Sequence, residues 1–183
     1  DFGIQFKKTE LLPTGDFDYG AVEKEIKNDP SIRMIFVQRS RGYTQRPTIS
    51  LEKMEAFFTF VKNLTDAVIM VDNCYGEFAA EKEPTAVGAD LIAGSLIKNP
   101  GGGLAQTGGY IAGRKDLIEK CAYRLTAVGI GKECGASLSQ LRYLYQGFFM
   151  APHTVLQAMK TAVFAAALFS EMGFAVSPSP EEK

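Results

Sequence analysis

The sequence has few residues of the types that bind metals. Of its 183 residues, the histidine is His153 and the cysteines are Cys74, Cys121 and Cys134. No two cysteines form a C-x-x-C pair, and a zinc site needs about four such ligands. We therefore predict no Cys/His metal site. An odd cysteine count is more typical of a reducing cytosol than of a disulfide framework, so we expect a cytoplasmic protein.

The sequence also lacks an excess of charge and a long apolar run. Its net charge is −1, and the basic residues are scattered. We therefore expect no binding to nucleic acid or to an acidic membrane. The longest wholly apolar run near the C-terminus, residues 162–169, is far shorter than the ~20 residues that cross a bilayer. No initiator Met or signal peptide begins the chain, and a turn-rich segment ends it, so we expect a fragment of a longer protein.

The residues that are present suit a globular α/β domain. Apolar residues make up 46% of the chain and charged residues 22%, which are ordinary values for a folded domain. Apolar runs at 32–37, 67–71, 90–93 and 109–112 predict strands, and the run at 67–71 is apolar on both faces, as in a buried parallel strand. Helical patterns separate several of them. This alternation predicts an α/β fold with a mostly parallel sheet and helices on its faces.

The helical patterns have identifiable starts and faces. Ser50 is a plausible N-cap, after which Met54, Phe57, Phe58 and Val61 share one face. A second amphipathic helix is predicted at 114–127. Its inward positions are expected to be Leu117, Ile118, Cys121 and Leu125.

The C-terminal third is predicted to be mainly helical. One helix is expected at 137–149. Pro152 suits the first turn of another, which would run to Met172 and end at Gly173. Residues 174–176 could open a further strand.

Asp72 and Lys98 are the strongest site candidates. Asp72 directly follows the apolar run that ends at Val71, and Lys98 lies just beyond the run that ends at Ala93. Ligands of open α/β sheets bind beyond the carboxyl ends of the strands. An amine and a carboxylate at this edge are what a pyridoxal 5'-phosphate (PLP) enzyme needs, because the lysine forms a Schiff base and the carboxylate pairs with the pyridinium nitrogen. The alternatives are a surface lysine and a capping aspartate.

Other residues near these two suit a cofactor. Ser95 precedes the lysine by three positions and could contact phosphate, or it could be a turn residue. Tyr75 could donate to the cofactor's phenolate oxygen, or it could be a packed aromatic. Gly101–Gly103 allow close backbone approach and positive φ. They form neither a P-loop nor a full G-x-G-x-x-G.

Several more polar residues have less specific signals. Arg39 and Arg41 flank a strand end and could bind a carboxylate or phosphate, or could be solvated or interface residues. Asn73 and Cys74 are more typical of packing neighbours than of chemistry. His153 reads as a residue at the start of a helix.

Four segments together resemble a known family. These are Val71–Phe78 (VDNCYGEF), Gly94–Gly103 (GSLIKNPGGG), Phe36–Tyr43 (FVQRSRGY) and Tyr145–His153. They resemble fold-type I PLP enzymes and, more narrowly, the bacterial methionine gamma-lyase family and aluminium resistance proteins. The resemblance covers nearly the whole chain.

The resemblance implies a PLP-dependent transferase-like major domain. Residues 1–150 would be that domain without its N-terminal part, 151–173 an interdomain helix, and 174–183 the start of a truncated small domain. By the same resemblance Lys98 is the Schiff-base lysine, Asp72 the pyridine partner and Ser95 a phosphate contact, with Tyr75 less clearly assigned. The family's phosphate loop, ring-stacking aromatic and substrate-carboxylate arginine lie outside these residues. A homodimer or homotetramer is expected.

The implied activity is carbon–sulfur bond cleavage in an amino acid such as methionine or cystathionine, with Lys98 as the base. The fragment alone is expected to be inactive. Three alternatives stay open. One is a PLP-dependent aminotransferase or cysteine desulfurase, which would use the same constellation. The others are a non-catalytic protein that retains the fold and a nucleotide-binding α/β domain, which the missing glycine fingerprint disfavours.

Overall fold

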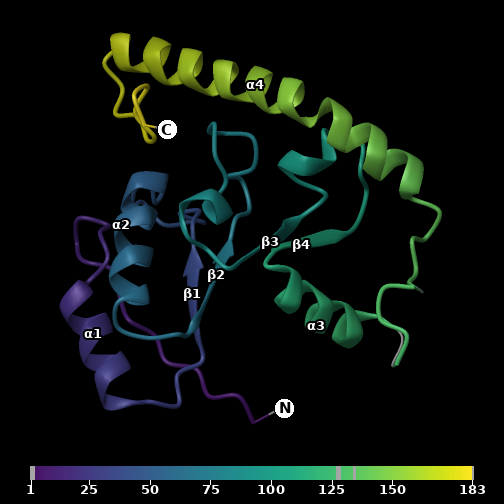
Figure 1. Cartoon of the computed structure of the whole chain (residues 1–183). Coiled ribbons are helices and arrows are strands. Elements are labelled where there is room, and N and C mark those ends of the chain that lie inside the picture. The colour runs from purple at the N-terminus through teal and green to yellow at the C-terminus, as the bar shows by residue number, and fades with distance from the viewer. Residues whose placement is uncertain (1–2, 127–128, 134, 183) are drawn as a thin grey trace.

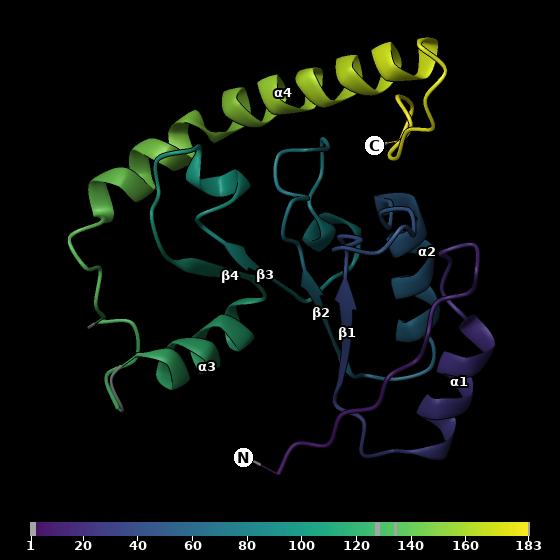
Figure 2. The same ribbon diagram turned by 180° about the vertical axis from the view of Figure 1, so that it is seen from behind.

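The computed structural model describes residues 3–126, 129–133 and 135–182. Cys134 and the predicted helix end at Ala127 lie outside the described residues. Figure 1 shows the elements, and Figure 2 shows them from behind. In chain order they are α1 (Tyr19–Asn28), β1 (Met34–Gln38), α2 (Leu51–Lys62), β2 (Val68–Asp72), the 3-10 helix η1 (Pro84–Val87), β3 (Leu91–Ser95), the 3-10 helix η2 (Asn99–Gly101), β4 (Gly109–Gly113), α3 (Lys115–Leu125) and α4 (Leu141–Glu171).

The sheet has the strand order β1-β2-β3-β4. β1 and β2 pair in parallel, as do β2 and β3, whereas β3 and β4 are antiparallel. The predicted α/β class with a mostly parallel sheet is therefore confirmed. In this register the carboxyl ends of β1, β2 and β3 meet at one edge, and the amino end of β4 joins them there, with Gly109 opposite Ser95.

One face of the sheet packs on α2, as its sequence pattern predicts. Ser50 caps the helix by accepting a hydrogen bond from the backbone N–H of Lys53 at 3.3 Å. The four predicted core residues are all buried, at 0–2% exposure: Met54, Phe57, Phe58 and Val61. They pack with the sheet residues of the core cluster, which include Ile69, Val71 and Ile92. The hydrophobic core of the domain therefore lies between α2 and the sheet.

The opposite face of the sheet is covered less evenly. On this face Phe36 of β1 is 51% exposed. Val68 and Met70 of β2 are only partly buried there, so the prediction that the run at 67–71 is buried on both faces is wrong for the described residues. Ile111 of β4 points to this face because it pairs with Ala93, the neighbour of the core residue Ile92. Ile111 and Ile118 of α3 line one groove there. Helix α3 thus forms the third layer at the β4 side.

The predicted face of α3 is only partly correct. Leu117, Ile118 and Cys121 are partly buried, but Leu125 is 70% exposed. No residue of this helix is fully buried. The reason is that α3 packs on a single edge strand, which is too narrow to cover a whole helical face.

Helix α4 corrects the predicted C-terminal region. It is one continuous helix of 31 residues with Pro152 inside it, where two helices were predicted. Proline removes one intrahelical hydrogen bond. Pro152 lies exposed, however, between the buried residues Ala151 and Val155, which anchor both flanks of the helix. Residues 174–176 follow in an irregular segment, so the predicted strand is wrong.

Two further points concern the helices. The sequence pattern missed α1, which begins at the N-cap Asp18 and buries only Ile26.

Among the helices of the described residues, none has the length and apolarity needed to cross a membrane. The domain division proposed above stays a prediction, and α4 is continuous across its boundary at 150 and 151.

Candidate cofactor site

The structure brings Asp72 and Ser95 to the same edge of the sheet, as predicted. Asp72 is the last residue of β2 and pairs with Ala93 of β3, two positions before Ser95. The backbone N–H of Asn73 donates to the carbonyl of Ala93 at 2.9 Å, which continues the pairing past the strand end. Asp72 Oδ1 accepts a hydrogen bond from the N–H of Cys74 at 3.0 Å. This bond sets the carboxylate across the start of the following turn.

Lys98 lies in the turn that joins β3 to η2. Its backbone N–H donates to the carbonyl of Ser95 at 3.3 Å. Its ammonium lies 4.5 Å from the ring centroid of Tyr75, which is the distance of a cation–π contact. A hydrogen bond with the side chain of Cys74 is the main cause that raises the pKa of Lys98, against the opposing effect of burial. Within the described residues Lys98 forms no ion pair with a carboxylate.

Tyr75 is held in an uncommon backbone conformation. Its φ is +69°, and Phe78 in the same turn has a φ of +59°. Non-glycine residues in this region cost on the order of 1–3 kcal/mol each and persist where their surroundings impose the conformation. The Tyr75 side chain is 60% exposed. Its ring is therefore presented at the edge of the sheet, below the amine of Lys98, rather than packed in the core.

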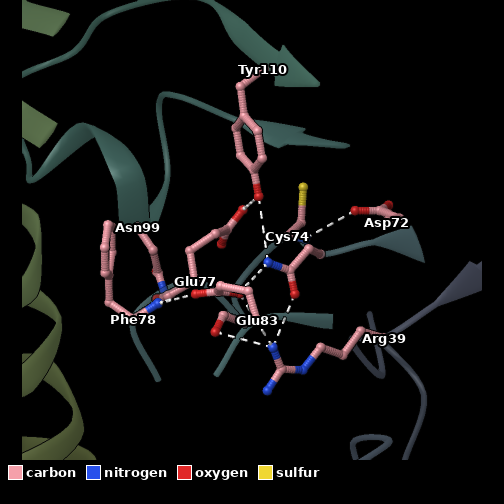
Figure 3. A network of polar contacts seen from close by, with 10 residues as sticks. Arg39, Asp72, Cys74, Glu77, Phe78, Glu83, Asn99 and Tyr110 are labelled. Atoms are coloured by element: carbon pink, nitrogen blue, oxygen red, sulfur yellow. Dashed lines mark hydrogen bonds and ion pairs between the residues drawn. The ribbon is translucent and has the colours of Figure 1, made fainter. Parts of the chain in front are cut away.

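Next to this turn lies a polar cluster, called the buried polar cluster because most of it is buried, although Glu83 and Tyr110 are partly exposed (Figure 3). We define it as Arg39, Asn73, Glu77, Glu83 and Tyr110. Asn73 is fully buried, and Arg39 and Glu77 are 6% and 4% exposed. Arg39 Nη1 donates to Asn73 Oδ1 at 2.9 Å, and Asn73 Nδ2 donates to Glu83 Oε2 at 2.7 Å. Tyr110 Oη donates to Glu77 Oε1 at 2.7 Å. The cluster thus joins the ends of β1 and β2 to β4.

The cluster also fixes the backbone of the turn. Arg39 Nη1 donates to the carbonyl of Gly76 at 3.1 Å, and Glu83 Oε1 accepts from the N–H of Phe78 at 3.0 Å. Burial raises the pKa of Glu77 and, with its bond to Glu77, that of Tyr110. Within the described residues Glu77 Oε2 and Arg39 Nε have no hydrogen-bond partner. The bonds to the Gly76 carbonyl and the Phe78 N–H hold the backbone of the turn, in which Tyr75 and Phe78 have positive φ.

The glycine-rich turn after Lys98 packs closely on α4. Gly102 has a φ of +55°, and a Cβ there would collide with the carbonyl of Gly147 in α4. A Cβ on Gly147 would in turn collide with Gly101. The predicted close approach and positive φ are therefore confirmed, and the partner is another glycine backbone. This contact seats the lysine turn on the long helix.

The arrangement fits PLP in its donor set. It offers the primary amine of a partly buried lysine and a carboxylate at the adjacent strand end, with a hydroxyl between them in sequence. In the part of the chain that the structure describes, no group of three or more His, Cys, Asp or Glu side chains lies together as metal ligands would. The groups that lie at this sheet edge are the amine of Lys98, the carboxylate of Asp72 and the hydroxyl of Ser95.

Comparison with known proteins decides the family. The family model described as methionine gamma-lyase matches residues 1–183. The chain belongs to the methionine gamma-lyase family. It is 49% identical to the uncharacterized protein YnbB of Bacillus subtilis over 184 residues, which cover 100% of this chain and 43% of that protein.

Solved structures agree with this assignment. A candidate cystathionine beta-lyase involved in aluminum resistance from Listeria innocua matches with a TM-score of 0.94 and 54% identity, over 100% of this chain and 45% of that one. The pyridoxal-5'-phosphate dependent protein YhfS of Escherichia coli matches with a TM-score of 0.57 and 16% identity, over 82% and 38% of the two chains, and shows the fold alone. The fold-type I major-domain fold is therefore confirmed. The chain spans less than half the length of YnbB and of the Listeria protein.

The structure gives protein partners to two of the less specific candidates and corrects a third. Arg39 is buried rather than solvated, and it donates to Asn73 and Gly76 and so supports the turn. Arg41 donates to Ser177 Oγ at 2.8 Å, which ties the loop after β1 to the C-terminal segment. His153 is an exposed residue inside α4 instead of a residue at a helix start.

Other members of the cluster were missed altogether. Glu83 and Tyr110 lie outside the quoted motifs, Glu77 lies within Val71–Phe78 without being singled out, and sequence separations of up to 33 positions hide their contacts. The sequence signal that could have found them is the pair of acidic residues, Glu77 and Glu83, that follows the apolar strand β2 within a short span. Such residues at a strand end are candidates for a polar network.

Proposed function

We propose that the full-length protein containing this chain is a PLP-dependent carbon–sulfur lyase that acts on a sulfur amino acid. The observation that carries the proposal is the placement of Lys98 and Asp72 at the carboxyl edge of neighbouring parallel strands in a member of the methionine gamma-lyase family. The Listeria relative, described as a candidate cystathionine beta-lyase, supports the same reaction class. Bound PLP would supply an electron sink for a carbanion at the substrate α-carbon.

Lys98 is assigned two tasks in this proposal. Its amine would hold PLP by forming a Schiff base with the cofactor aldehyde, with loss of water, and once the substrate amine had displaced it, the free amine would accept the substrate α-proton. Its raised pKa means that the amine is protonated at neutral pH in the structure described. We therefore expect attachment to require loss of a proton and to become faster as the pH rises.

Asp72, Ser95 and Tyr75 are assigned supporting tasks. The Asp72 carboxylate would pair with the pyridine nitrogen and keep it protonated, and the Ser95 hydroxyl would donate to phosphate. Tyr75 already lies against the Lys98 ammonium, so its ring would limit where the amine can move. We also propose that the whole protein is a cytoplasmic homodimer or homotetramer, with its substrate a small amino acid.

The test is an absorbance spectrum of the full-length protein purified with PLP, beside Lys98→Ala. The control is Lys24→Ala, which removes an exposed lysine from α1. We expect a band near ~420 nm, bleached by borohydride, in the wild type and the control, and its loss in Lys98→Ala. A protein without this band would refute the PLP assignment.

Products then decide the reaction. Incubation of the PLP-loaded protein with cystathionine or methionine should consume water and release a thiol, ammonia and an oxo acid, and cysteine should release hydrogen sulfide in place of the thiol. Transfer of the amino group to an added oxo acid would instead indicate an aminotransferase. Release of sulfur with alanine as product would indicate a desulfurase, and turnover of none of these would favour a non-catalytic role.

A further inference from the structure

Two turns of the described chain bear the candidate residues, and they belong to different strands. The aspartate turn, residues 72–78, follows β2 and carries Asp72 and Tyr75. The lysine turn, residues 95–101, follows β3 and carries Ser95 and Lys98. Their strands are paired only as far as Asp72 and Ala93. One backbone bond beyond that point, from the N–H of Asn73 to the carbonyl of Ala93, continues the pairing, and a side chain joins the farther parts of the two turns.

Asn99 connects these turns directly. Its Nδ2 donates to the backbone carbonyl of Glu77 at 3.0 Å, across 22 positions of sequence. Asn99 is the residue after Lys98 and the first of η2, and its own carbonyl accepts from the N–H of Gly102 at 3.1 Å. The bond therefore joins the aspartate turn to the residue adjacent to the candidate lysine.

The acceptor of this bond is firmly held. Glu77 is 4% exposed, and its side chain accepts the Tyr110 hydrogen bond at 2.7 Å. Gly94 leaves room for this arrangement, because a Cβ at Gly94 would collide with Glu77 and Tyr110. The buried polar cluster thus holds Glu77 against β4, and the bond from Asn99 to the Glu77 carbonyl fixes the lysine turn relative to Glu77.

We propose that Asn99 is a positioning residue that sets the place of Lys98 relative to Asp72 through the carbonyl of Glu77. The proposal deepens the proposed function and rests on it for the role of Lys98. A reacting group must be held to within ~0.5 Å of its productive position. Lys98 has a flexible side chain, and its contacts with Tyr75 and Cys74 come from the same aspartate turn. Loss of the Asn99 bond would let the two turns drift apart.

The experiment compares Asn99→Ala with Asn63→Ala in the full-length protein. Asn63 is exposed at the C-cap of α2, remote from both turns, so its variant controls for loss of an asparagine side chain. The first measurement is amide hydrogen exchange without cofactor. We expect protection of residues 95–101 to fall about tenfold in Asn99→Ala, with α2 unchanged.

The second measurement is binding of PLP itself. We expect the Kd of PLP for Asn99→Ala to rise about tenfold and the pH midpoint of the ~420 nm band to move, because the geometry around Lys98 has changed. Asn99→Gln retains the amide and should recover part of both effects. A purely structural role would lower overall stability and leave the pH midpoint where it is.

The outcomes separate the two proposals. Equal exchange and equal PLP affinity in the Asn99→Ala and Asn63→Ala proteins would overturn the positioning role. Absence of PLP binding in the wild type would overturn the proposed function, while the exchange measurement would still decide whether Asn99 ties the turns together. If Asn99→Ala does not fold, Asn99→Ser carries the test, because its hydroxyl is too short to reach the Glu77 carbonyl.

Discussion

Replacing Gly147 of α4 by alanine should displace the lysine turn. A Cβ at this position would lie 2.9 Å from the carbonyl carbon of Gly101 and 3.4 Å from its Cα, with the carbonyl oxygen closer still. Carbon atoms pack best at about 3.5–4.0 Å. The helix and η2 would therefore have to separate by at least about 0.6–1.1 Å, the difference between those distances and 2.9 Å, because the carbonyl oxygen is closer still. Gly101 is only three positions after Lys98, so this movement would reach the candidate lysine.

The magnitude follows from two opposed effects. Overpacking of a tight contact costs about 1–3 kcal/mol. Alanine in a helix interior is favoured over glycine by about 1 kcal/mol, which offsets part of that cost. Gly20→Ala in the first turn of α1 is a control that gains helix propensity without overpacking, because its Cβ would meet only Asp18 Oδ1 at an ordinary 3.6 Å. The free energies of unfolding of the two variants should therefore differ by about 1–3 kcal/mol, with Gly20→Ala the more stable.

Urea denaturation of the full-length variants measures this difference, and PLP titration measures its effect on the site. A misplacement of about 1 Å can reduce the rate of a reaction about a hundredfold, so we expect Gly147→Ala to bind PLP weakly or react slowly. If Gly147→Ala is as stable as Gly20→Ala and binds PLP like the wild type, the close contact between η2 and α4 does not constrain the lysine turn.

Three further predictions concern single side chains. Tyr110→Phe leaves Glu77 Oε1 buried without its donor, and should lower the free energy of unfolding in urea by about 1–3 kcal/mol; the exposed Tyr143→Phe should change it by less than about 0.5 kcal/mol. Burial raises the pKa of Glu77 above its ordinary 4.5, so the folded state holds this proton more strongly than the unfolded state. The free energy of unfolding should therefore fall as the pH rises from about 4.5 through the raised pKa. In Glu77→Gln that fall should be smaller, and a pH profile like that of the wild type would contradict the assignment. Ser50→Ala removes the cap of α2 and should cost about 0.5–2 kcal/mol in thermal unfolding, whereas an unchanged melting temperature would show that the cap is unimportant.

Much of the fold was predictable because local patterns carry it. The apolar runs located all four strands, and the spacing of Met54, Phe57, Phe58 and Val61 located the buried face of α2. The same runs placed Asp72 and Ser95, because a residue that directly follows a buried parallel strand must lie at the sheet edge. These inferences needed only neighbours in sequence.

The predictions that were wrong concern features that depend on contacts between distant segments of the chain. Pro152 reads as a helix start, but Ala151 and Val155 pack near η2 and carry the helix through it. Residues 174–176 have the composition of a strand and no neighbouring strand to pair with among the described residues. The buried polar cluster draws on three strand ends, and no local pattern distinguishes its polar residues from solvated ones. The roles of Lys98, Asp72, Ser95 and Tyr75 stay predictions until PLP binding is measured.

The way α4 is attached has a mechanical consequence. Its buried residues, Gly147, Ala151 and Val155, all lie in its first half, and the 16 residues after Val155, up to Glu171, extend about 24 Å at 1.5 Å per residue. The helix therefore behaves as a lever whose fulcrum is the lysine turn. A tilt of about 5° would move its C-terminal end by about 2 Å at that rise per residue, but the turn at the fulcrum by only a small fraction of this. Motion at the C-terminal end of α4 should therefore displace Lys98 very little, although the lysine turn packs against the same helix.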